Sequence, residues 1–350
     1  MTGQIPALEI ENILAATRDL WEQMRGGRIF ISGGTGFFGC WLLESFTSIN
    51  RRLDLNATAV VLTRNPAAFH RKAPHLATQS SVELIAGDIR SFEFPAGDFP
   101  FLIHAATDAD ALAAIKAPLQ TLDTIVEGTR RVLEFASRCG AKKLLFTSSG
   151  AVYGKQPSDL THIPETYSGA PDPVVTGSAY GEGKRIAEML CCHYGEKYRF
   201  ESKIARCFAF AGPRLPLDGH FAIGNFVRDA MAGGPVRIEG DGTPYRSYLY
   251  AGDLAIWLWT ILFRGKARQP YNVGSESEVT IAELAAAVVE VIDPRVRIEM
   301  AGVAVPGKPP LRYVPSTKLA RTELGLKENI DLKEAILRMA RWRRNEKGRE

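Results

Sequence analysis

The chain has 350 residues, of which 45% are hydrophobic, 23% charged and 9% aromatic. This composition is typical of a globular protein with one large domain or two, and it excludes a disordered chain, a collagen and a disulfide miniprotein. The 43 Lys and Arg residues and the 39 Asp and Glu residues are interspersed and leave a formal net charge of only +4. We therefore expect a small-molecule partner and no nucleic-acid partner.

The cysteines and the apolar runs indicate the cellular setting. The five cysteines are odd in number and follow neither a Cys-x-x-Cys nor a Cys/His metal spacing, so we expect free thiols and no metal site; they are Cys40, Cys139, Cys191, Cys192 and Cys207. The longest strongly apolar run, Leu254 to Phe263, is shorter than the roughly 20 residues of a membrane-spanning helix. We expect a cytoplasmic protein with no membrane partner.

Residues 1–27 carry an apolar stripe at helical spacing, ahead of the first predicted strand. The stripe consists of Ile10, Ile13, Leu14, Thr17, Leu20, Trp21 and Met24. We predict an amphipathic N-terminal helix that packs on the body of the protein and takes no part in chemistry.

Residues 28–195 alternate short β-rich runs with helical ones. The predicted strands are Arg28–Ser32, Ala57–Thr63, Val82–Ile85, Phe101–His104 and Lys143–Thr147. Strands that alternate with helices imply βαβ units, so we predict an α/β fold: a Rossmann-type, doubly wound parallel sheet that binds a dinucleotide.

Residues 196–350 have looser spacing, with Pro-rich loops around residues 212–218 and 306–310. Helices are predicted near Ile223–Ala232, Gly252–Phe263 and Ile281–Ile292. We predict a smaller C-terminal substrate-binding lobe, some segments of which return to the Rossmann sheet.

A glycine turn directly follows the first predicted strand. Gly33, Gly36 and Gly39 form a Gly-x-x-Gly-x-x-Gly pattern around Phe37 and Phe38, and an apolar helix follows. Glycine lets the backbone turn tightly and approach a pyrophosphate, whose charge is stabilised by N–H groups at the helix N-terminus. Because the turn stands between a strand and a helix, we predict dinucleotide binding.

The ends of the second and third strands bear on which dinucleotide is bound. Folds that select NAD usually place an acidic residue after the second strand, but this chain has Arg64, which could neutralise the 2′-phosphate of NADP. Asp88, followed by Ile89, is placed to accept a hydrogen bond from the adenine amino group, or is an ordinary turn residue. The cofactor is therefore NAD or NADP.

Ser149, Tyr180 and Lys184 are the predicted catalytic residues. The Tyr-x-x-x-Lys spacing places the phenol and the ammonium on one helix face, and Ser149 stands at a strand end about 30 residues upstream. A neighbouring ammonium favours the phenolate, so we expect a lowered pKa for Tyr180, which would act as the base for a sugar hydroxyl. Tyr180 and Lys184 would also contact the cofactor.

From about residue 28 to residue 325 the sequence resembles the extended short-chain dehydrogenases/reductases of the nucleotide-sugar epimerase/dehydratase group. Besides the glycine turn and Tyr180 with Lys184, the resemblance rests on ordered motifs: His104-Ala105-Ala106-Thr107, Ser148-Ser149-Gly150-Ala151-Val152-Tyr153-Gly154, Ala205-Arg206-Cys207-Phe208, Gly212-Pro213-Arg214, Asn225-Phe226, Gly240-Asp241-Gly242-Thr243-Pro244-Tyr245-Arg246, Asp253 and Tyr271-Asn272-Val273-Gly274. Several motifs in one order make coincidence improbable.

The resemblance implies that the second lobe binds a nucleoside diphosphate sugar. It assigns Ala105 and Ala106 to the cofactor and Thr107, with Ser149, to the substrate. It also assigns Asn225 and Arg246 to the diphosphate, and Arg312 to the same anion. An Arg fork suits that role because it pairs with two phosphate oxygens.

Departures from the group's pattern narrow the reaction. The 4,6-dehydratases of this group carry an Asp-Glu pair where this chain has Gly150 and Ala151, and the decarboxylases usually keep the Glu. An Asn that commonly follows the Arg-x-Phe step is Ala209 here. Loss of water needs a general acid and a base, which a dehydratase would have to take from neighbouring loops, such as Asp108 or Glu165.

Hydride transfer at sugar C4 without elimination remains, and we place an epimerase-type enzyme first. The alternative is an NADPH-dependent reductase of nucleotide 4-keto sugars, which Arg64 favours. A 4,6-dehydratase and a nucleotide-sugar decarboxylase come after these two. A non-catalytic NAD(P)-sensing protein comes last, because Ser149, Tyr180 and Lys184 are all present.

Relatives of this group commonly dimerise through a pair of helices, which implies a homodimer. The equivalent helices, Asp123–Ser137 and Ser178–Tyr194, carry the apolar rows Ile125, Val126, Val132, Leu133 and Ile186, Ala187, Leu190. The same rows could instead pack on the sheet, since any α/β helix has one apolar face.

Overall fold

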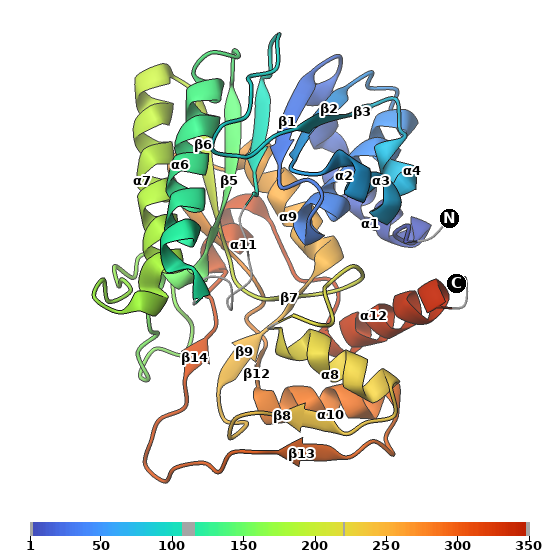
Figure 1. Cartoon of the computed structure of the whole chain (residues 1–350), viewed down its shortest axis with the longest axis vertical. Helices are drawn as coiled ribbons and strands as arrows, with labels where there is room; N and C mark the ends of the chain where they lie inside the picture. Colours follow the sequence, from blue (N-terminus) through green and yellow to red (C-terminus); the bar gives the residue numbers. More distant parts are fainter. Residues whose placement is uncertain (1–2, 107–115, 220, 348–350) are drawn as a thin grey trace.

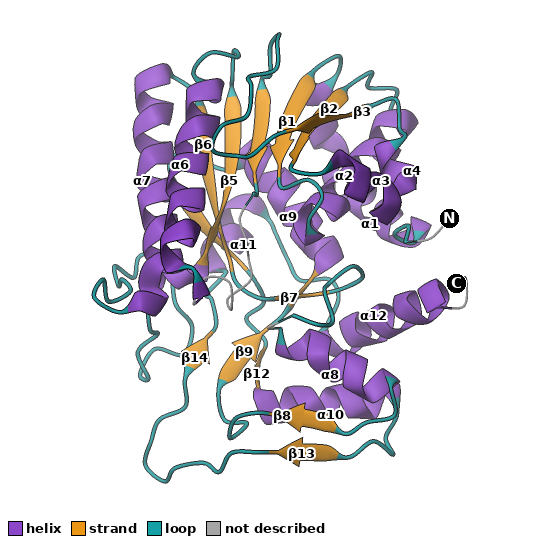
Figure 2. Ribbon diagram, in the orientation of Figure 1, coloured by secondary structure: helices purple, strands orange, loops and turns teal. Residues whose placement is uncertain are grey.

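The computed structural model describes residues 3–106, 116–219 and 221–347. Its centre is a parallel sheet of seven strands in the order β11-β6-β5-β4-β1-β2-β3, a Rossmann-type fold (Figures 1 and 2). The strands are β1 (Arg28–Ser32), β2 (Thr58–Thr63), β3 (Val82–Ala86), β4 (Phe101–His104), β5 (Lys143–Ser149), β6 (Glu201–Cys207) and β11 (Pro270–Val273). The predicted fold class is confirmed, and β6 and β11 bring the second half of the chain back to the sheet.

Helices cover both faces of this sheet, because successive side chains of a strand point to opposite faces. Ile29 and Ile31 of β1 lie in the core with α2 (Phe37–Arg52) and α9 (Ala251–Arg264). Phe30, between them, lies in a second core with α6 (Pro118–Ala136) and α7 (Ala179–Tyr198). Three smaller helices complete the Rossmann part and its edge: α3 (Pro66–Lys72), α4 (Pro74–Ala77) and α11 (Lys318–Leu324).

The N-terminal segment packs on the core that α2 and α9 share. It consists of α1 (Ala7–Thr17) and a 3-10 turn at Arg18–Met24. The Trp21 ring is fully buried, with its centroid 4.7 Å from that of Trp259 on α9. The burial of this apolar stripe fastens the segment to the body of the protein.

The C-terminal lobe lies beyond the ends of the main strands, below the large sheet in Figure 1. It has a three-stranded sheet in the order β12-β9-β14, a pair β13-β8 and a pair β10-β7. Its elements are β7 (Phe210–Ala211), α8 (Ala222–Met231), β8 (Val236–Ile238), β9 (Tyr245–Ser247), β10 (Leu249–Tyr250), β12 (Glu278–Thr280), α10 (Ile281–Ile292), β13 (Ile298–Met300), β14 (Arg312–Tyr313) and α12 (Leu332–Lys347). Short strands and loops of this lobe therefore face the ends of the main strands.

The apolar rows of α6 and α7 are used largely inside the chain. Ile125, Val132, Leu133 and Ala187 are buried in the core with Phe30, so their packing partner is the sheet. The homodimer accordingly remains a prediction. None of the described helices is both long and apolar enough to cross a membrane.

Candidate active site

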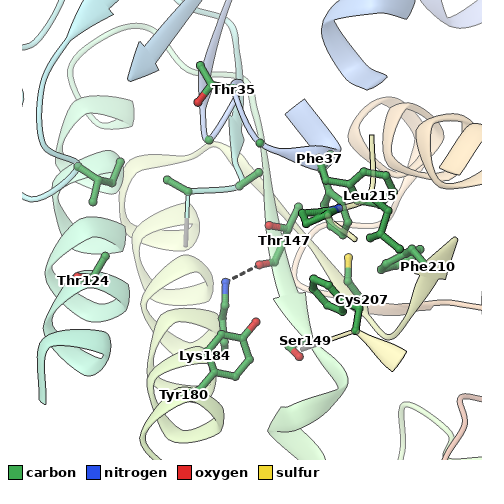
Figure 3. A pocket seen from close by; sticks show the side chains of 18 of the residues that line it. Thr35, Phe37, Thr124, Thr147, Ser149, Tyr180, Lys184, Cys207, Phe210 and Leu215 are labelled. Carbon is green, nitrogen blue, oxygen red and sulfur yellow. Dashed lines mark hydrogen bonds between the residues drawn. The ribbon is translucent and has the colours of Figure 1, made fainter. Parts of the chain in front are cut away.

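A cavity of about 1130 Å³ lies between the C-terminal ends of the parallel strands and the C-terminal lobe (Figure 3). This is where open α/β sheets bind their ligands. Thirteen of the residues proposed from the sequence line it: Gly33, Gly36, Phe37, Phe38, Arg64, Asp88, Ile89, Ala105, Ala106, Ser149, Tyr180, Lys184 and Arg246. Thr107 and Asp108 lie outside the described residues.

The glycine turn leaves no room for a side chain at two of its positions. A Cβ at Gly33 would lie 2.5 Å from the Ala105 carbonyl, and a Cβ at Gly39 would lie 2.3 Å from the Gly34 backbone, so both positions need glycine for close packing. Gly36 is different: it caps the N-terminus of α2, lines the cavity, and would place a Cβ no closer than 3.3 Å to one carbonyl oxygen. The missing side chain leaves the amide groups at the start of α2 open to an anion.

Asp88 lines the cavity away from Tyr180 and has basic side chains as neighbours. Asp88 accepts two hydrogen bonds from the Arg90 guanidinium, at 2.9 and 3.0 Å, and a third from the Arg90 amide. These bonds lower the pKa of Asp88 to about 2. The charge of Arg64 also lowers the pKa of Asp88, and both Arg64 and Lys72 line the cavity. The Asp88 carboxylate is thus ionised and partly engaged at the end of the cavity where the adenosine was predicted.

Tyr180 and Lys184 lie one turn apart on α7 and face β5, as Figure 3 shows. The Lys184 Nζ donates a hydrogen bond to the Thr147 carbonyl oxygen at 2.9 Å and lies 5.8 Å from the centre of the Tyr180 ring. Burial lowers the pKa of the Lys184 ammonium to about 8. Burial also raises the pKa of the Tyr180 phenol above its usual value, an effect that a hydrogen bond with Ser149 offsets only in part.

The lowered pKa expected for Tyr180 is therefore wrong for this arrangement. The ammonium lies within hydrogen-bond distance of a main-chain carbonyl instead of the phenol, so its field does not overcome the desolvation of the phenolate. The phenol is protonated at neutral pH in this arrangement. For Tyr180 to act as a base, Lys184 or another positive charge must come closer to the phenol and lower its pKa.

An ion pair anchors α7 to the sheet below the catalytic turn. Glu188 accepts two hydrogen bonds from the guanidinium of Arg206 on β6, at 2.9 and 2.7 Å, and one from Ser148 on β5, at 2.5 Å. Both charged side chains are mostly buried, and the carboxylate raises the pKa of Arg206 above its usual value. This bidentate pair fixes the height of α7 relative to the strand that carries Ser149.

Ser149 stands at the end of β5 beside a second phenol that the sequence reasoning missed. Its Oγ accepts a hydrogen bond from the Ala151 amide at 3.1 Å and lies 3.5 Å from the Tyr313 hydroxyl. Tyr313 also lines the cavity. Its position next to Arg312 could have indicated it. Successive side chains of a strand point to opposite faces, so if Arg312 faces away from the cavity, Tyr313 faces into it.

Two residues proposed for the diphosphate do not line the cavity. Arg312 forms an ion pair with Glu278 and lies over the Tyr245 ring, 4.0 Å from its centre. Asn225 accepts a hydrogen bond from Arg228 at 3.3 Å and is not among the lining residues. Arg246 does line it.

The described lining of the cavity has few carboxylates, and none beside the predicted catalytic residues. Among the described lining residues, Asp88 is the only one, and it belongs to the opposite end. Glu165 accepts a hydrogen bond from the Asn272 amide at 2.9 Å and does not line the cavity. Instead, apolar and aromatic side chains form a wall of the cavity: Cys207, Phe208, Phe210, Leu215, Phe221, Tyr248 and Ile281.

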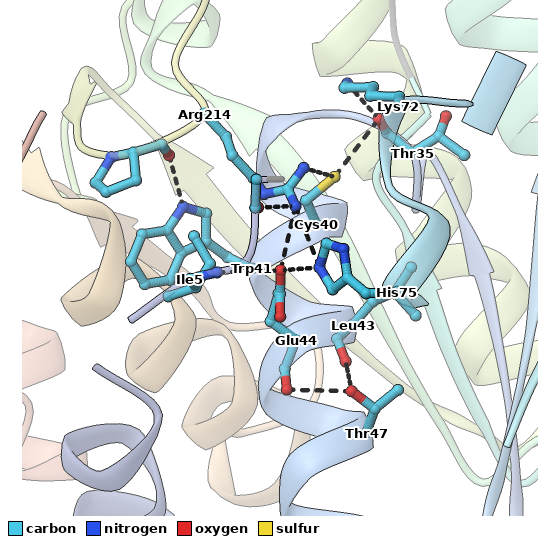
Figure 4. A network of polar contacts seen from close by, with 12 residues as sticks. Ile5, Thr35, Cys40, Trp41, Leu43, Glu44, Thr47, Lys72, His75 and Arg214 are labelled. Atoms are coloured by element: carbon cyan, nitrogen blue, oxygen red, sulfur yellow. Dashed lines mark hydrogen bonds and ion pairs between the residues drawn. The ribbon is translucent and has the colours of Figure 1, made fainter. Parts of the chain in front are cut away.

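A buried network below the glycine turn holds part of that wall (Figure 4). Glu44 of α2 accepts hydrogen bonds from Arg214 at 3.2 Å and from the Ile5 amide at 3.3 Å, and its other neighbour is His75 at 2.7 Å. All three charged or titratable side chains are buried. The network joins the N-terminal segment and α2 to the loop that carries Leu215 into the cavity.

The family model described as the NAD dependent epimerase/dehydratase family matches residues 29–274. The match spans the glycine turn, the residues predicted to be catalytic and much of the C-terminal lobe. The chain belongs to the NAD-dependent epimerase/dehydratase family. The resemblance stated from the sequence is thereby confirmed. The family is NAD dependent, so the prediction of a nicotinamide dinucleotide cofactor is confirmed as well.

Curated relatives include plant and animal decarboxylases. UDP-glucuronic acid decarboxylase 3 of Arabidopsis thaliana is 32% identical over 316 residues, which cover 88% of this chain and 86% of that protein. UDP-glucuronic acid decarboxylase 1 of Xenopus tropicalis is 28% identical over 320 residues and is covered to 72%. The relationship extends over nearly the whole chain.

Solved structures share the fold at lower identity. A UDP-N-acetylglucosamine 4-epimerase from Methanobrevibacter ruminantium has a TM-score of 0.78 at 19% identity, over 92% of this chain and 99% of that one. A dTDP-glucose 4,6-dehydratase from Streptomyces venezuelae with bound NAD has a TM-score of 0.77 at 23% identity, over 92% and 98%. One architecture thus carries several reactions, so the site must decide between them.

Proposed function

We propose that this protein is a nucleotide-sugar epimerase-type enzyme that transfers hydride at sugar C4, with Tyr180 as the acid/base. The observation that carries the proposal is the cavity itself: Tyr180, Ser149 and Lys184 meet at one end of a space that also contains the glycine turn, while no carboxylate stands beside them among the described lining residues. Such a site can move a proton and a hydride at one carbon. It lacks the acid and base that elimination of water needs.

The described residues fit a dinucleotide. The amides that follow Gly36 would hold the pyrophosphate, and Ile89, Ala105 and Ala106 would contact the nucleoside halves along the strand ends. A bound nicotinamide would supply the acceptor for the hydride of sugar C4 and the donor for its return. Lys184 would then direct its ammonium to both the ribose and the phenol, which favours removal of the C4 hydroxyl proton by Tyr180.

Substrate binding is assigned to the lobe side of the cavity. Arg246 would pair with the diphosphate, while Ser149 would hydrogen-bond the C4 oxygen beside Tyr180. An epimerase must also let the 4-keto sugar rotate, so that hydride can return to the opposite face of C4. The apolar wall around Phe208, Phe221 and Ile281 supports this, because it makes few polar contacts that would hold the sugar in one orientation.

The second candidate is a nucleotide-uronic acid decarboxylase, which the curated relatives favour. Its first step is the same oxidation at C4. The carboxylate on C5 is then β to the C4 ketone and can leave as carbon dioxide, with its bonding electron pair passing into an enolate. That enolate would take up a proton at C5, and hydride would return to C4. An apolar cavity assists the loss of carbon dioxide because the charge becomes more dispersed. Ala151 stands against this candidate, since the decarboxylases usually carry Glu at that position.

Product analysis by proton NMR distinguishes these reactions. The purified protein with NAD is incubated separately with UDP-glucose, dTDP-glucose and UDP-glucuronate. A C4 epimer from any of them supports the proposal. Release of carbon dioxide with a UDP-pentose from UDP-glucuronate establishes the second candidate instead, and a 4-keto-6-deoxy sugar overturns both.

A parallel incubation with NADPH and a nucleotide 4-keto sugar addresses the reductase. If NADPH is oxidised stoichiometrically here, and the hydroxy sugars give no C4 epimer in the first incubations, the protein is that reductase and not an epimerase. Cofactor that stays bound through purification in its oxidised form supports an enzyme that recycles it.

A further inference from the structure

Tyr313 is the one residue of the catalytic end of the cavity that is supplied by the lobe strand β14. This strand runs parallel to β9, with Tyr313 opposite Arg246 and Arg312 opposite Tyr245. The pleat turns Arg312 toward Glu278, outside the cavity lining, and turns Tyr313 into the cavity beside Arg246. The Arg246 guanidinium lies 5.8 Å from the centre of the Tyr313 ring.

The hydroxyl of Tyr313 reaches the reacting end of the site. It lies 3.5 Å from the Ser149 Oγ, and its proximity contributes to the raised pKa of the Tyr180 phenol. It also occupies the space above Gly150: a Cβ there would lie 2.8 Å from the Tyr313 oxygen and 2.7 Å from the Phe208 ring. The phenol thus fills the place from which dehydratase relatives project an acidic side chain.

The surrounding backbone holds Tyr313 in this position. The amide of the next residue, Val314, donates to Gln156 Oε1 at 3.0 Å, and its carbonyl accepts from the Ile163 amide at 2.9 Å. The Phe208 ring packs on the phenol with centroids 4.7 Å apart. A side chain fixed from both sides, with its polar end toward the cavity, is preorganised for a ligand rather than merely filling space.

The neighbours of Tyr313 indicate which part of a ligand it meets. It lies between Arg246, assigned to the diphosphate, and Ser149 with Tyr180, assigned to C4, so the sugar ring of the proposed substrate must pass it. Burial raises the pKa of Tyr313 to about 12. The hydroxyl therefore keeps its proton at neutral pH and can donate it in a hydrogen bond.

We propose that Tyr313 is a further catalytic residue, whose hydroxyl donates a hydrogen bond to the C4 oxygen of the sugar, beside Ser149. This inference rests on the proposed function. Together, three hydroxyl groups would surround the oxygen: Tyr180 exchanges its proton, while Ser149 and Tyr313 stabilise the negative charge that grows on it as the proton leaves. No bond to Tyr313 forms or breaks.

The test replaces Tyr313 with Phe, which removes only the hydroxyl. Turnover should fall about 10- to 100-fold while KM rises only a few-fold, the loss expected for one hydrogen bond that strengthens as charge develops. The isotope effect with sugar deuterated at C4 should rise, because hydride transfer becomes slower relative to other steps. The matched control is Tyr245→Phe, from the neighbouring strand and outside the cavity lining, which should leave turnover within about twofold.

Binding separates this inference from the proposed function. Calorimetry measures the affinities of the wild type and of Tyr313→Phe for UDP-glucose and for UDP. If the wild type converts a different nucleotide sugar, that sugar and its nucleoside diphosphate are used instead. The variant should bind the nucleotide sugar a few-fold more weakly and UDP with unchanged affinity. Unchanged turnover and an unchanged affinity ratio would overturn the role of Tyr313, even if the wild type is active. If the wild type turns over no sugar, the affinity ratio still decides whether Tyr313 contacts the sugar.

Discussion

Replacement of Lys184 tests the electrostatics of the site in the free protein. The ammonium is buried, has one main-chain carbonyl as its hydrogen-bond partner, and lies 4.8 Å from the centre of the Phe146 ring. Burial lowers its pKa from the usual 10.5 to about 8. Burial of this charge therefore lowers the free energy of unfolding at neutral pH. That cost should disappear as the side chain loses its proton at higher pH.

The sign and size of the effect follow from proton linkage. Below pH 8 both the folded and the unfolded chain hold the proton of Lys184. Between pH 8 and 10.5 the folded chain has released it and the unfolded chain retains it, so stability rises with pH. From pH 7 to pH 9.5 this side chain should add about 2 kcal/mol to the free energy of unfolding.

The assay is urea unfolding at a series of pH values, for the wild type, Lys184→Met and Lys184→Arg. Each variant should lack the gain of about 2 kcal/mol relative to the wild type, since Met has no proton to release and Arg keeps its charge. Met should give the more stable variant at pH 7. If both variants gain stability with pH in parallel with the wild type, the buried ammonium is not the cause and the reasoning is refuted.

Three further predictions concern the cofactor and the assembly. Gly36→Val should weaken NADH and NADPH alike by about tenfold or more, measured by fluorescence titration, because a side chain there blocks the approach to the α2 amides; unchanged affinities would remove the pyrophosphate from the glycine turn. Arg64→Ala should weaken NADPH about tenfold and leave NADH nearly unchanged, if Arg64 meets a 2′-phosphate; equal effects on both would show that it selects neither. Light scattering at micromolar concentration should give the mass of a homodimer, and a monomer mass would reject the dimer.

The Rossmann part of the fold was predictable because its signals are local. β1 begins and ends at the predicted residues, Arg28 and Ser32, and β3 extends the prediction by a single residue. Buried parallel strands are continuous apolar runs with Gly or polar residues at their ends, and the glycine turn is a fixed spacing of one residue type. The positions of Ser149, Tyr180 and Lys184 in one cavity follow from the same order of strands and helices.

The lobe side of the site depends on contacts that sequence spacing does not reveal. The resemblance assigned Arg312 to the diphosphate, yet the pairing of β14 with β9 turns Tyr313, and not Arg312, toward the cavity. The pKa of Tyr180 was misjudged because the burial that raises it depends on three-dimensional packing, as does the hydrogen bond that directs Lys184 to the Thr147 carbonyl. The role of Glu188 below the catalytic turn likewise needs three elements to meet.

The most direct test of hydride transfer at C4 is the turnover of Tyr180→Phe with a nucleotide sugar that the wild type converts. The variant should lose about 100-fold or more in kcat, because the proton-transfer group is gone, while it binds NAD with an affinity within about twofold of the wild type. Turnover within a few-fold of the wild type would contradict the assignment of Tyr180 as the acid/base.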